Sequence, residues 1–231
     1  MVEEQRQYPL GRRHAPDERD IAFPFKLALP ELPVKPVPTS KFWRSGRPIL
    51  DQGRFPQCVA YAWKQFLMAA PIMQGRKLDA QEVYEQAQAI DEFSDTPPAG
   101  GTSVRAGAKV LQLKGFIGNY LWATTIEEIK QWVLQHGPVV MGTNWYSEMF
   151  TGHVETHSLL QGFWVVPNGE LVGGHAYVCQ GYSLRRHAFR CLNSWGSGWG
   201  NWGKFWIAEE HLDYLLQQQG EACTATEVRA V

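Results

Sequence analysis

The sequence is poor in cysteine, in long apolar runs and in net charge. Its 231 residues include only four cysteines and no Cys-x-x-Cys spacing, which excludes a disulfide-stapled scaffold. No apolar run approaches the roughly 18 residues that span a bilayer, and the start MVEEQRQYPLGRRHAPDERD lacks the apolar core of a signal peptide. The 22 basic and 23 acidic side chains nearly cancel, which argues against binding to nucleic acid or an anionic membrane. We therefore expect a cytoplasmic protein that acts on peptides, proteins or small molecules.

The first 40 residues differ in composition from the rest of the chain. A charged stretch is followed by five prolines between Pro24 and Pro38, which exclude helix and favour extended chain. Two interpretations stay open: an arm that lies over the body of the protein, or a flexible tail. If the segment is an arm that covers a cleft, deletion of residues 1–40 should raise activity.

The next part of the chain, residues 41–137, has the pattern of a helical lobe. Apolar residues recur at helical spacing, and capping residues and glycine or proline stops mark the ends. Cys58 lies in the first turn of the first helix. The four helices are predicted to run from Gln57 to Pro71, from Asp79 towards Phe93, from Ser103 to Gly115 and from Thr125 to Gly137.

After Pro138 the pattern changes to short strands. Segments rich in β-branched and aromatic residues are separated by turn residues such as Asn168-Gly169. The strand segments are VVMGTNW, GFWVVPNGELV, HAYVCQGY, FRCLNSW and KFWIA. We predict an α+β protein of two lobes, the second an antiparallel sheet or barrel over residues 138–231, with a cleft where the lobes meet.

The position of Cys58 makes it a candidate nucleophile. A helix N-terminus stabilises a thiolate through its free N–H groups and its dipole, and a histidine is needed to hold the proton. Among seven histidines, His175 opens a strand directly after two glycines. If residues 183–187 form a hairpin loop, His175 lies diagonally across from Asn193. Asn193 could then orient the imidazole, and Trp195 could shield their hydrogen bond from water.

The same hairpin register and the loop before the first helix supply three more assignments. Cys179 is expected opposite Cys191, and we interpret these two residues as buried core thiols. Gln52 could place its amide beside the Cys58 N–H and stabilise a developing oxyanion. A lone cysteine is more often structural than reactive, so the catalytic hypothesis depends on the order and context of these residues together.

Several segments together resemble the papain-like cysteine peptidase family. DQGRFPQCVAYA is similar to the family's nucleophile segment, GGHAYVCQGY to its histidine strand, and CLNSWGSGWGNWGKFWI to its asparagine and tryptophan block. PAGGTSVRAGAKVLQLKG resembles its glycine-rich substrate loop and HGPVVMGTN its entry into the barrel. The resemblance covers about residues 45–208 and implies a papain-like two-lobe fold. It also implies that Cys58 is the nucleophile, His175 the acid/base, Asn193 the orienting residue and Gln52 the oxyanion glutamine.

The substrate side of the site is implied in the same way. Gly100 and Gly101 would lie along the backbone of a bound peptide, while Gly142 and Gly174 would border the main side-chain pocket. Because both of these glycines are small, we hypothesise an unobstructed pocket for a bulky apolar group. The implied reaction is hydrolysis of a peptide bond through a thioester acyl-enzyme, on a peptide or protein substrate and without a cofactor.

The sequence departs from the family pattern beside the nucleophile. Phe55 replaces a disulfide cysteine, and Val59 replaces an aromatic residue. We expect no long helical pro-segment, and any latency is then expected to come from the short arm or from another mechanism. Two alternatives stay open: isopeptidase, deamidase or transpeptidase action at the same site, and a catalytically silent peptide-binding module.

Two other motifs carry weaker signals. His153 and His157 are four residues apart, a spacing that binds metal on a helix, but the surrounding glycine and threonines favour a loop. GWGNWG is rich in glycine but lacks the GxGxxG pattern and a P-loop lysine. We expect neither a metal site nor a nucleotide site from these segments.

Overall fold

The computed structural model describes residues 8–25, 38–74, 77–91, 93, 100–157 and 161–228. Most of the proline-rich part of the N-terminal segment, residues 26–37, lies outside the described residues. The α-helices are α1 (Cys58–Met68), α2 (Ala80–Ile90), α3 (Val104–Leu113), α4 (Ile126–Gln135) and α5 (Glu209–Gln217). The strands are β1 (Ser40–Phe42), β2 (Asn119–Ala123), β3 (Val139–Tyr146), β4 (His153–Glu155), β5 (Gly162–Trp164), β6 (Leu171–Ser183), β7 (Ala188–Leu192), β8 (Lys204–Ala208) and β9 (Glu221–Thr226).

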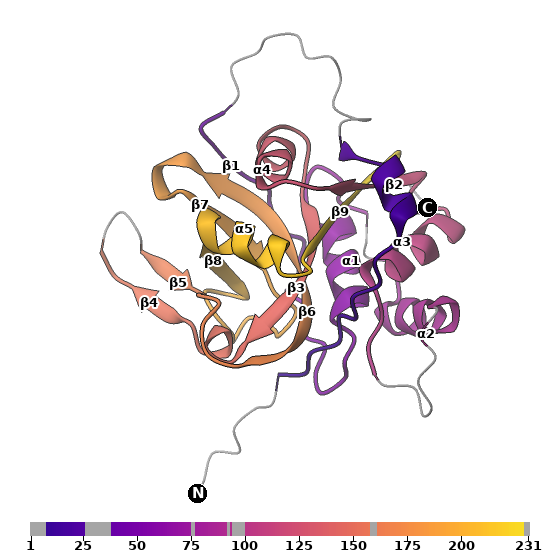
Figure 1. Ribbon diagram of the computed structural model, residues 1–231, viewed down its shortest axis with the longest axis horizontal. Coiled ribbons are helices and arrows are strands. Elements are labelled where there is room, and N and C mark those ends of the chain that lie inside the picture. The colour runs from indigo at the N-terminus through magenta and orange to yellow at the C-terminus, as the bar shows by residue number, and fades with distance from the viewer. Residues whose placement is uncertain are drawn as a thin grey trace, which may run out of the picture.

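The nine strands of the described residues form one open, mixed sheet (Figure 1). Their order is β2-β9-β3-β6-β7-β8-β5-β4, and β1 pairs with β6 beside this path. β5 and β8 run parallel, with Trp164 paired to Trp206, while the other strand pairs are antiparallel. The α+β class is confirmed, and of the two forms predicted for residues 138–231, a sheet or a barrel, the structure has an open sheet. After β8, helix α5 carries the chain back to add β9 beside β3, and so the sheet does not close.

The four predicted helices are confirmed. Asp79, Ser103 and Thr125 cap α2, α3 and α4 by accepting backbone N–H groups on their side chains. α1 begins at Cys58 after Gln57, which makes no side-chain cap. The first N–H groups of α1 therefore have no acceptor on the Gln57 side chain, which suits a site that must bind negative charge.

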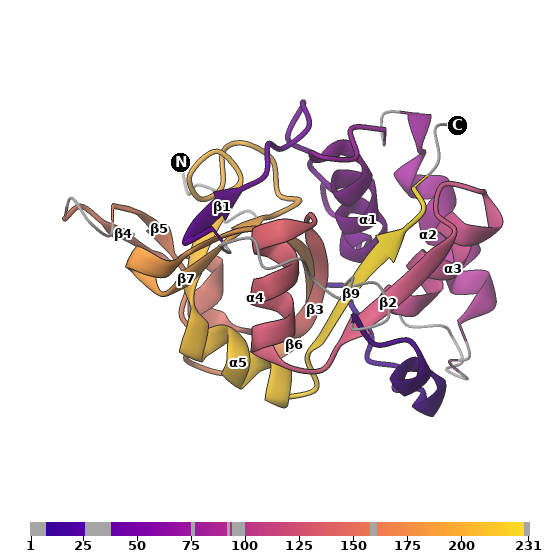
Figure 2. The same ribbon diagram turned by 90° about the horizontal axis from the view of Figure 1, so that it is seen from above.

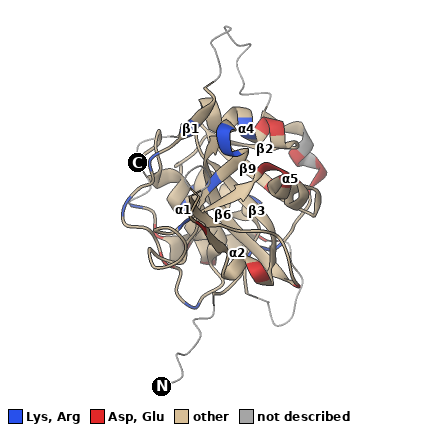
Figure 3. Ribbon diagram, turned by 90° about the vertical axis from the view of Figure 1, so that its left-hand side faces the viewer, with Lys and Arg blue, Asp and Glu red and all other residues tan. Residues whose placement is uncertain are grey.

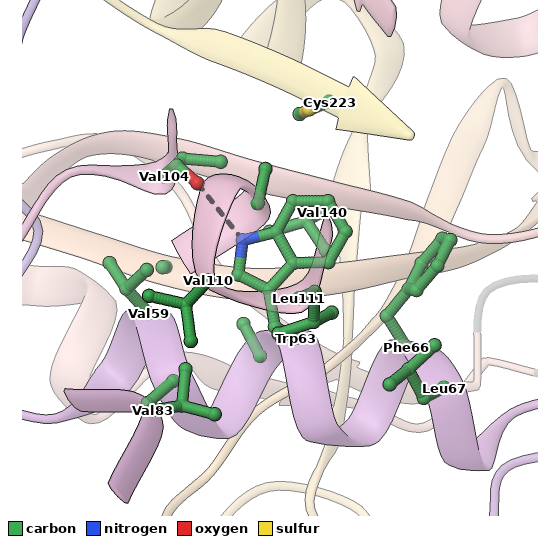
Figure 4. Close-up of a cluster of buried hydrophobic side chains, with 14 of the residues drawn as sticks. Val59, Trp63, Phe66, Leu67, Val83, Val104, Val110, Leu111, Val140 and Cys223 are labelled. Atoms are coloured by element: carbon green, nitrogen blue, oxygen red, sulfur yellow. Dashed lines mark hydrogen bonds between the residues drawn. The ribbon is translucent and has the colours of Figure 1, made fainter. Parts of the chain in front are cut away.

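Two clusters of buried apolar side chains lie on opposite faces of the central strands. Alternate residues of β3 and β6 enter one cluster or the other, and α1, α2 and α3 cover the first face (Figure 2). Figure 4 is a close-up of side chains in this first cluster, where Nε1 of Trp63 donates a hydrogen bond of 3.0 Å to the carbonyl of Val104. α4 and α5 contribute to the second cluster, and Cys223 of β9 belongs to the first. The buried clusters thus do not divide at residue 137, where the sequence pattern changes.

The contact between α4 and α5 closes the outer side of the second cluster. Nζ of Lys130 lies 2.6 Å from Oε1 of Glu209, and Figure 3 shows α4 and α5 on this side of the ribbon with their charged segments coloured. In the part of the chain that the structure describes, no helix is both long enough and apolar enough to cross a membrane.

Residues 8–25 lie against the body of the protein (Figure 1). Phe25 is fully buried, with its ring centroid 5.0 Å from that of Trp132. Asp17 and Asp20 both form ion pairs with Arg105 of α3. The described part of the N-terminal segment is therefore an arm, the first of the two interpretations.

Candidate active site

Cys58 is the first residue of α1 and is fully buried. The backbone N–H groups of Ala176, Gly11 and Val59 lie near its sulfur and favour the thiolate. Burial raises the pKa of the thiol to about 11, because removal of water disfavours the thiolate, and the three N–H groups offset only part of this effect. Cys58 is a neutral thiol in this conformation, despite its place at a helix N-terminus.

The hairpin of β6 and β7 brings His175 and Asn193 together. Cys179 faces Cys191, as predicted, and both are free and buried. Nε2 of His175 lies 2.7 Å from Oδ1 of Asn193. The same oxygen accepts the N–H of Ser194 at 2.7 Å, which fixes the orientation of the amide. Because Oδ1 can only accept, Nε2 carries the proton and Nδ1 keeps a lone pair, the tautomer that a base needs.

Aromatic rings enclose this hydrogen bond. The ring of Trp195 stacks on the His175 ring with centroids 4.5 Å apart, and Trp145 of β3 meets the imidazole edge-on at 4.8 Å. Tyr8 of the arm stacks on Trp195 at 4.7 Å. Trp195 is almost fully buried, and its ring covers one face of the imidazole.

Gln52 is held beside this group by the residue after Asn193. Its Oε1 accepts a hydrogen bond of 2.6 Å from Oγ of Ser194, and this orients its amide nitrogen. Nε2 of Gln52 donates to the carbonyl of Phe55 at 2.9 Å and to the carbonyl of Pro9 at 3.2 Å. The Gln52 amide, which was predicted to donate to an oxyanion, therefore donates to a backbone carbonyl of the arm in this structure.

The arm runs through the site as an added length of extended chain. The N–H groups of Gly11 and Arg12 both donate to the carbonyl of Gly174, at 3.1 and 3.0 Å. On the other side, the Thr102 N–H donates to the carbonyl of Gly11 at 2.9 Å, and the Arg13 N–H donates to the carbonyl of Thr102 at 3.0 Å. The arm thus bridges the loop before α3 and the start of the histidine segment.

The glycines of the predicted substrate loop lie next to the arm. Gly101 is buried, has φ +104° and donates its N–H to the Tyr84 hydroxyl at 3.1 Å. A Cβ at Gly101 would come within 2.4 Å of the carbonyl oxygen of Gly11, so only glycine allows this approach. Gly100 is exposed, and a Cβ there would meet the ring of Pro56. Gly101 contacts the arm, whereas Gly100 supports the loop beside it.

The side-chain pocket predicted at Gly142 and Gly174 contains an ion pair. Nε of Arg12 lies 3.0 Å from Oε1 of Glu221, and both side chains are almost fully buried. A Cβ at Gly142 would fall within 3.0 Å of both groups, and a Cβ at Gly174 would meet the Arg12 backbone. The expected unobstructed apolar pocket is therefore corrected: a carboxylate from β9 lines it and a guanidinium fills it.

Burial sets the charge state of His175 as well. It lowers the pKa of the imidazole to about 4, and the hydrogen bond to Asn193 opposes this shift only in part. Nδ1 of His175 is buried and makes no hydrogen bond with any described residue, Cys58 included. The thiolate and imidazolium pair that the sequence suggested is thus replaced by two neutral groups.

Sequence reasoning missed several residues of the site. No site role was predicted for Arg12 of the N-terminal segment or for Glu221 near the C-terminus, and their ion pair joins two segments far apart in the sequence. Ser194 and Trp145 lie in motifs that were quoted, but their roles depend on contacts between strands. Since Thr143 is paired with His175 in the β3–β6 register, Trp145 could have been found from that register.

The remaining histidines do not form a metal site in the described residues. His153 is the first residue of β4 and His157 lies in a bend beyond it, so the pair is not on a helix. No group of three or more His, Cys, Asp or Glu side chains gathers as metal ligands do among the residues that the structure describes.

The chain has the fold of the papain-like cysteine proteases. Xylellain, a cysteine protease from Xylella fastidiosa, is 20% identical with a TM-score of 0.67, and the match covers 97% of this chain and 99% of that one. Digestive procathepsin L2 proteinase from Tenebrio molitor larval midgut is 17% identical with a TM-score of 0.67, covering 98% of this chain and 80% of that one. No protein-family model and no curated protein matches the sequence. At identities this low the structural likeness shows the fold alone, and the function has to be argued from the site.

Proposed function

We propose that this chain is a cysteine peptidase that hydrolyses peptide bonds through Cys58, His175 and Asn193. The observation that carries the proposal is the buried 2.7 Å hydrogen bond between His175 and Asn193, which leaves Nδ1 of the imidazole as the basic nitrogen. It is combined with a cysteine at a helix N-terminus in a papain-like fold. The resemblance of the flanking motifs adds support from the sequence.

The reaction follows from these groups. His175 takes the proton of the Cys58 thiol, and the thiolate attacks the carbonyl carbon of a peptide bond. The Gln52 amide and the Cys58 N–H stabilise the oxyanion, and His175 returns its proton to the departing amine. Water then adds to the thioester and is deprotonated by His175, which restores the thiol and releases the new C-terminus.

We also propose that the described conformation is latent because the arm fills the cleft. The arm is not placed for its own cleavage: the carbonyl on the Gln52 amide belongs to Pro9, whereas an N–H group, that of Gly11, meets the sulfur of Cys58. Attack requires one carbonyl to have its oxygen at Gln52 and its carbon at the sulfur. The arm can therefore occupy the site without being consumed.

The pocket at Gly142 supports a preference for basic side chains. Arg12 shows that a guanidinium fits between this glycine and the Glu221 carboxylate. Burial raises the pKa of Glu221, and the charge of Arg12 opposes that shift, so a cation in the pocket stabilises the carboxylate. A substrate with Arg or Lys at the corresponding position would replace Arg12 in this contact.

The test is a mass-spectrometric survey of products from a diverse peptide library. Full-length protein, a variant lacking residues 1–40 and the same truncation with Cys58→Ala are compared. We expect new C-termini only with the truncated protein that keeps Cys58. The cleaved peptides should carry Arg or Lys at the position whose side chain enters the pocket at Gly142. Glutamine-to-glutamate mass shifts or transfer products would instead assign a different acyl transfer. Peptide binding without any product would assign a silent binding module.

A further inference from the structure

Two adjoining cavities outside the cleft are lined by positively charged side chains. One cavity has a volume of about 490 Å³ and lies over β7 and β8, beside the turn that joins β6 to β7. An adjoining cavity of about 590 Å³ shares Arg47, Arg190 and Lys204 with it. The cavity residues do not include Cys58 or His175, so this region is separate from the candidate active site.

The strand register explains why the cations meet. Arg190 of β7 is paired with Trp206 of β8, and Lys204 lies two residues before Trp206. Their side chains therefore share one face of the sheet, while Phe189, Cys191 and Phe205 point to the other face and into the second cluster. Arg47, from the loop before α1, and Arg186, from the turn after β6, complete the group.

No carboxylate offsets these charges among the described residues. The lining of the two cavities contains no Asp or Glu and five cationic side chains: Arg44, Arg47, Arg186, Arg190 and Lys204. Burial and the neighbouring charges of Arg190 and Arg47 lower the pKa of Lys204. Nε of Arg190 is buried and has no hydrogen-bond partner. An anion would relieve the repulsion and would supply the missing acceptor.

Aromatic side chains hold two of the guanidinium groups in place. Arg186 lies over the Trp206 ring at 4.4 Å and donates from Nη1 to the carbonyl of Gln161 at 2.9 Å. Arg190 lies over the Phe42 ring at 4.4 Å. Planar donors that are fixed before binding match the oxygen geometry of phosphate and lose little entropy when it binds.

We propose that these cavities bind a small anion with two linked phosphate groups. Two phosphates match the number of cations better than one, and a concave site of this volume suits a small molecule. The net charge of −1 for the whole chain gives no general attraction for long polyanions. Recognition therefore depends on the local cluster.

The test is isothermal titration calorimetry of the full chain with pyrophosphate at fixed ionic strength. We expect one site per chain, with affinity reduced about tenfold in Arg190→Gln and in Lys204→Gln. Lys64→Gln on α1 removes the same charge from a residue that lines neither cavity, and should change the affinity less than about twofold. Cys58→Ala should bind as the native chain does, so failure of the proposed peptidase would not affect the result.

Three outcomes would overturn the proposal. The first is pyrophosphate binding that is unchanged in Lys204→Gln. Lys204 is less buried than Arg190, so this variant still gives a clear result if Arg190→Gln fails to fold. The second is an equal loss in Lys64→Gln, which would show nonspecific attraction. The third is binding of heparin without binding of pyrophosphate, which would assign the surface to a polymer.

Discussion

Gly11→Ala should displace the arm and make Cys58 reactive. A Cβ at Gly11 would lie 2.1 Å from the carbonyl oxygen of Pro56, 2.4 Å from its carbonyl carbon and 2.9 Å from its Cα. These are backbone atoms, which cannot turn aside as a flexible side chain does. Overpacking of this kind costs about 1–3 kcal/mol. At about 1.4 kcal/mol per tenfold, the equilibrium between occupied and open cleft should shift by about 5- to 150-fold.

The assay is the rate of alkylation of Cys58 by iodoacetamide, measured by peptide mapping. With a pKa of about 11, the thiolate fraction at pH 7 in the occupied form is only about 10⁻⁴. Labelling should therefore follow the population of the open form and rise with it. The other three cysteines are buried in the core, and their labelling serves as an internal measure of unfolding.

Gly198→Ala is the matched control. Gly198 is exposed, and a Cβ there would meet nothing within 4 Å, so labelling and stability should stay at native values. If Gly11→Ala labels Cys58 no faster than Gly198→Ala does, the arm is not what limits access to the thiol. If Gly11→Ala unfolds, Tyr8→Ala provides the same test, because it removes the ring of the arm that stacks on Trp195 and Phe150.

Three further predictions concern the pocket, the histidine and its partner. In the truncated protein, Glu221→Gln should lower kcat/KM for an Arg substrate relative to a Leu substrate by about tenfold, since the buried carboxylate is lost; an unchanged ratio would refute the basic pocket. His175 binds a proton at about pH 4 in the folded chain and near pH 6.5 when unfolded, so the unfolded state takes up more protons. Stability should therefore be full above pH 6.5 and fall by about 3 kcal/mol towards pH 4. Urea unfolding at several pH values measures this, and His175→Gln should flatten the curve. Asn193→Ala should lower kcat by about a hundredfold with little change in KM, because the imidazole loses its orientation.

The sequence alone was sufficient to predict those elements whose residue pattern lies within one short segment of the chain. The helix that begins at Cys58 could be placed because apolar spacing and Pro71 define its ends. The hairpin register could be placed because its loop fixes which residues face each other, and this brought His175 to Asn193. Each inference needed only neighbouring residues or one short loop.

The remaining features depend on contacts between distant segments. β2 and β9 form a strand pair from residues about a hundred positions apart, and neither segment has a strong strand pattern of its own. The position of Arg12 beside Glu221 requires the arm, β3 and β9 to be placed first. The apolar pocket inferred from two glycines failed for this reason, since glycines show only that space exists and not which side chain enters it.

The pKa values of Cys58 and His175 explain how a short arm could keep the site latent. A catalytic ion pair needs a thiol that loses its proton and an imidazole that accepts it. With the arm in place both groups are fully buried, and this burial raises the pKa of the first to about 11 and lowers that of the second to about 4, although Gly11 and Arg12 of the arm themselves favour the thiolate. Both shifts favour the neutral pair. Displacement of the arm would therefore do more than open a path for substrate: water would return to the cleft, and the proton transfer that activates the cysteine would become favourable again.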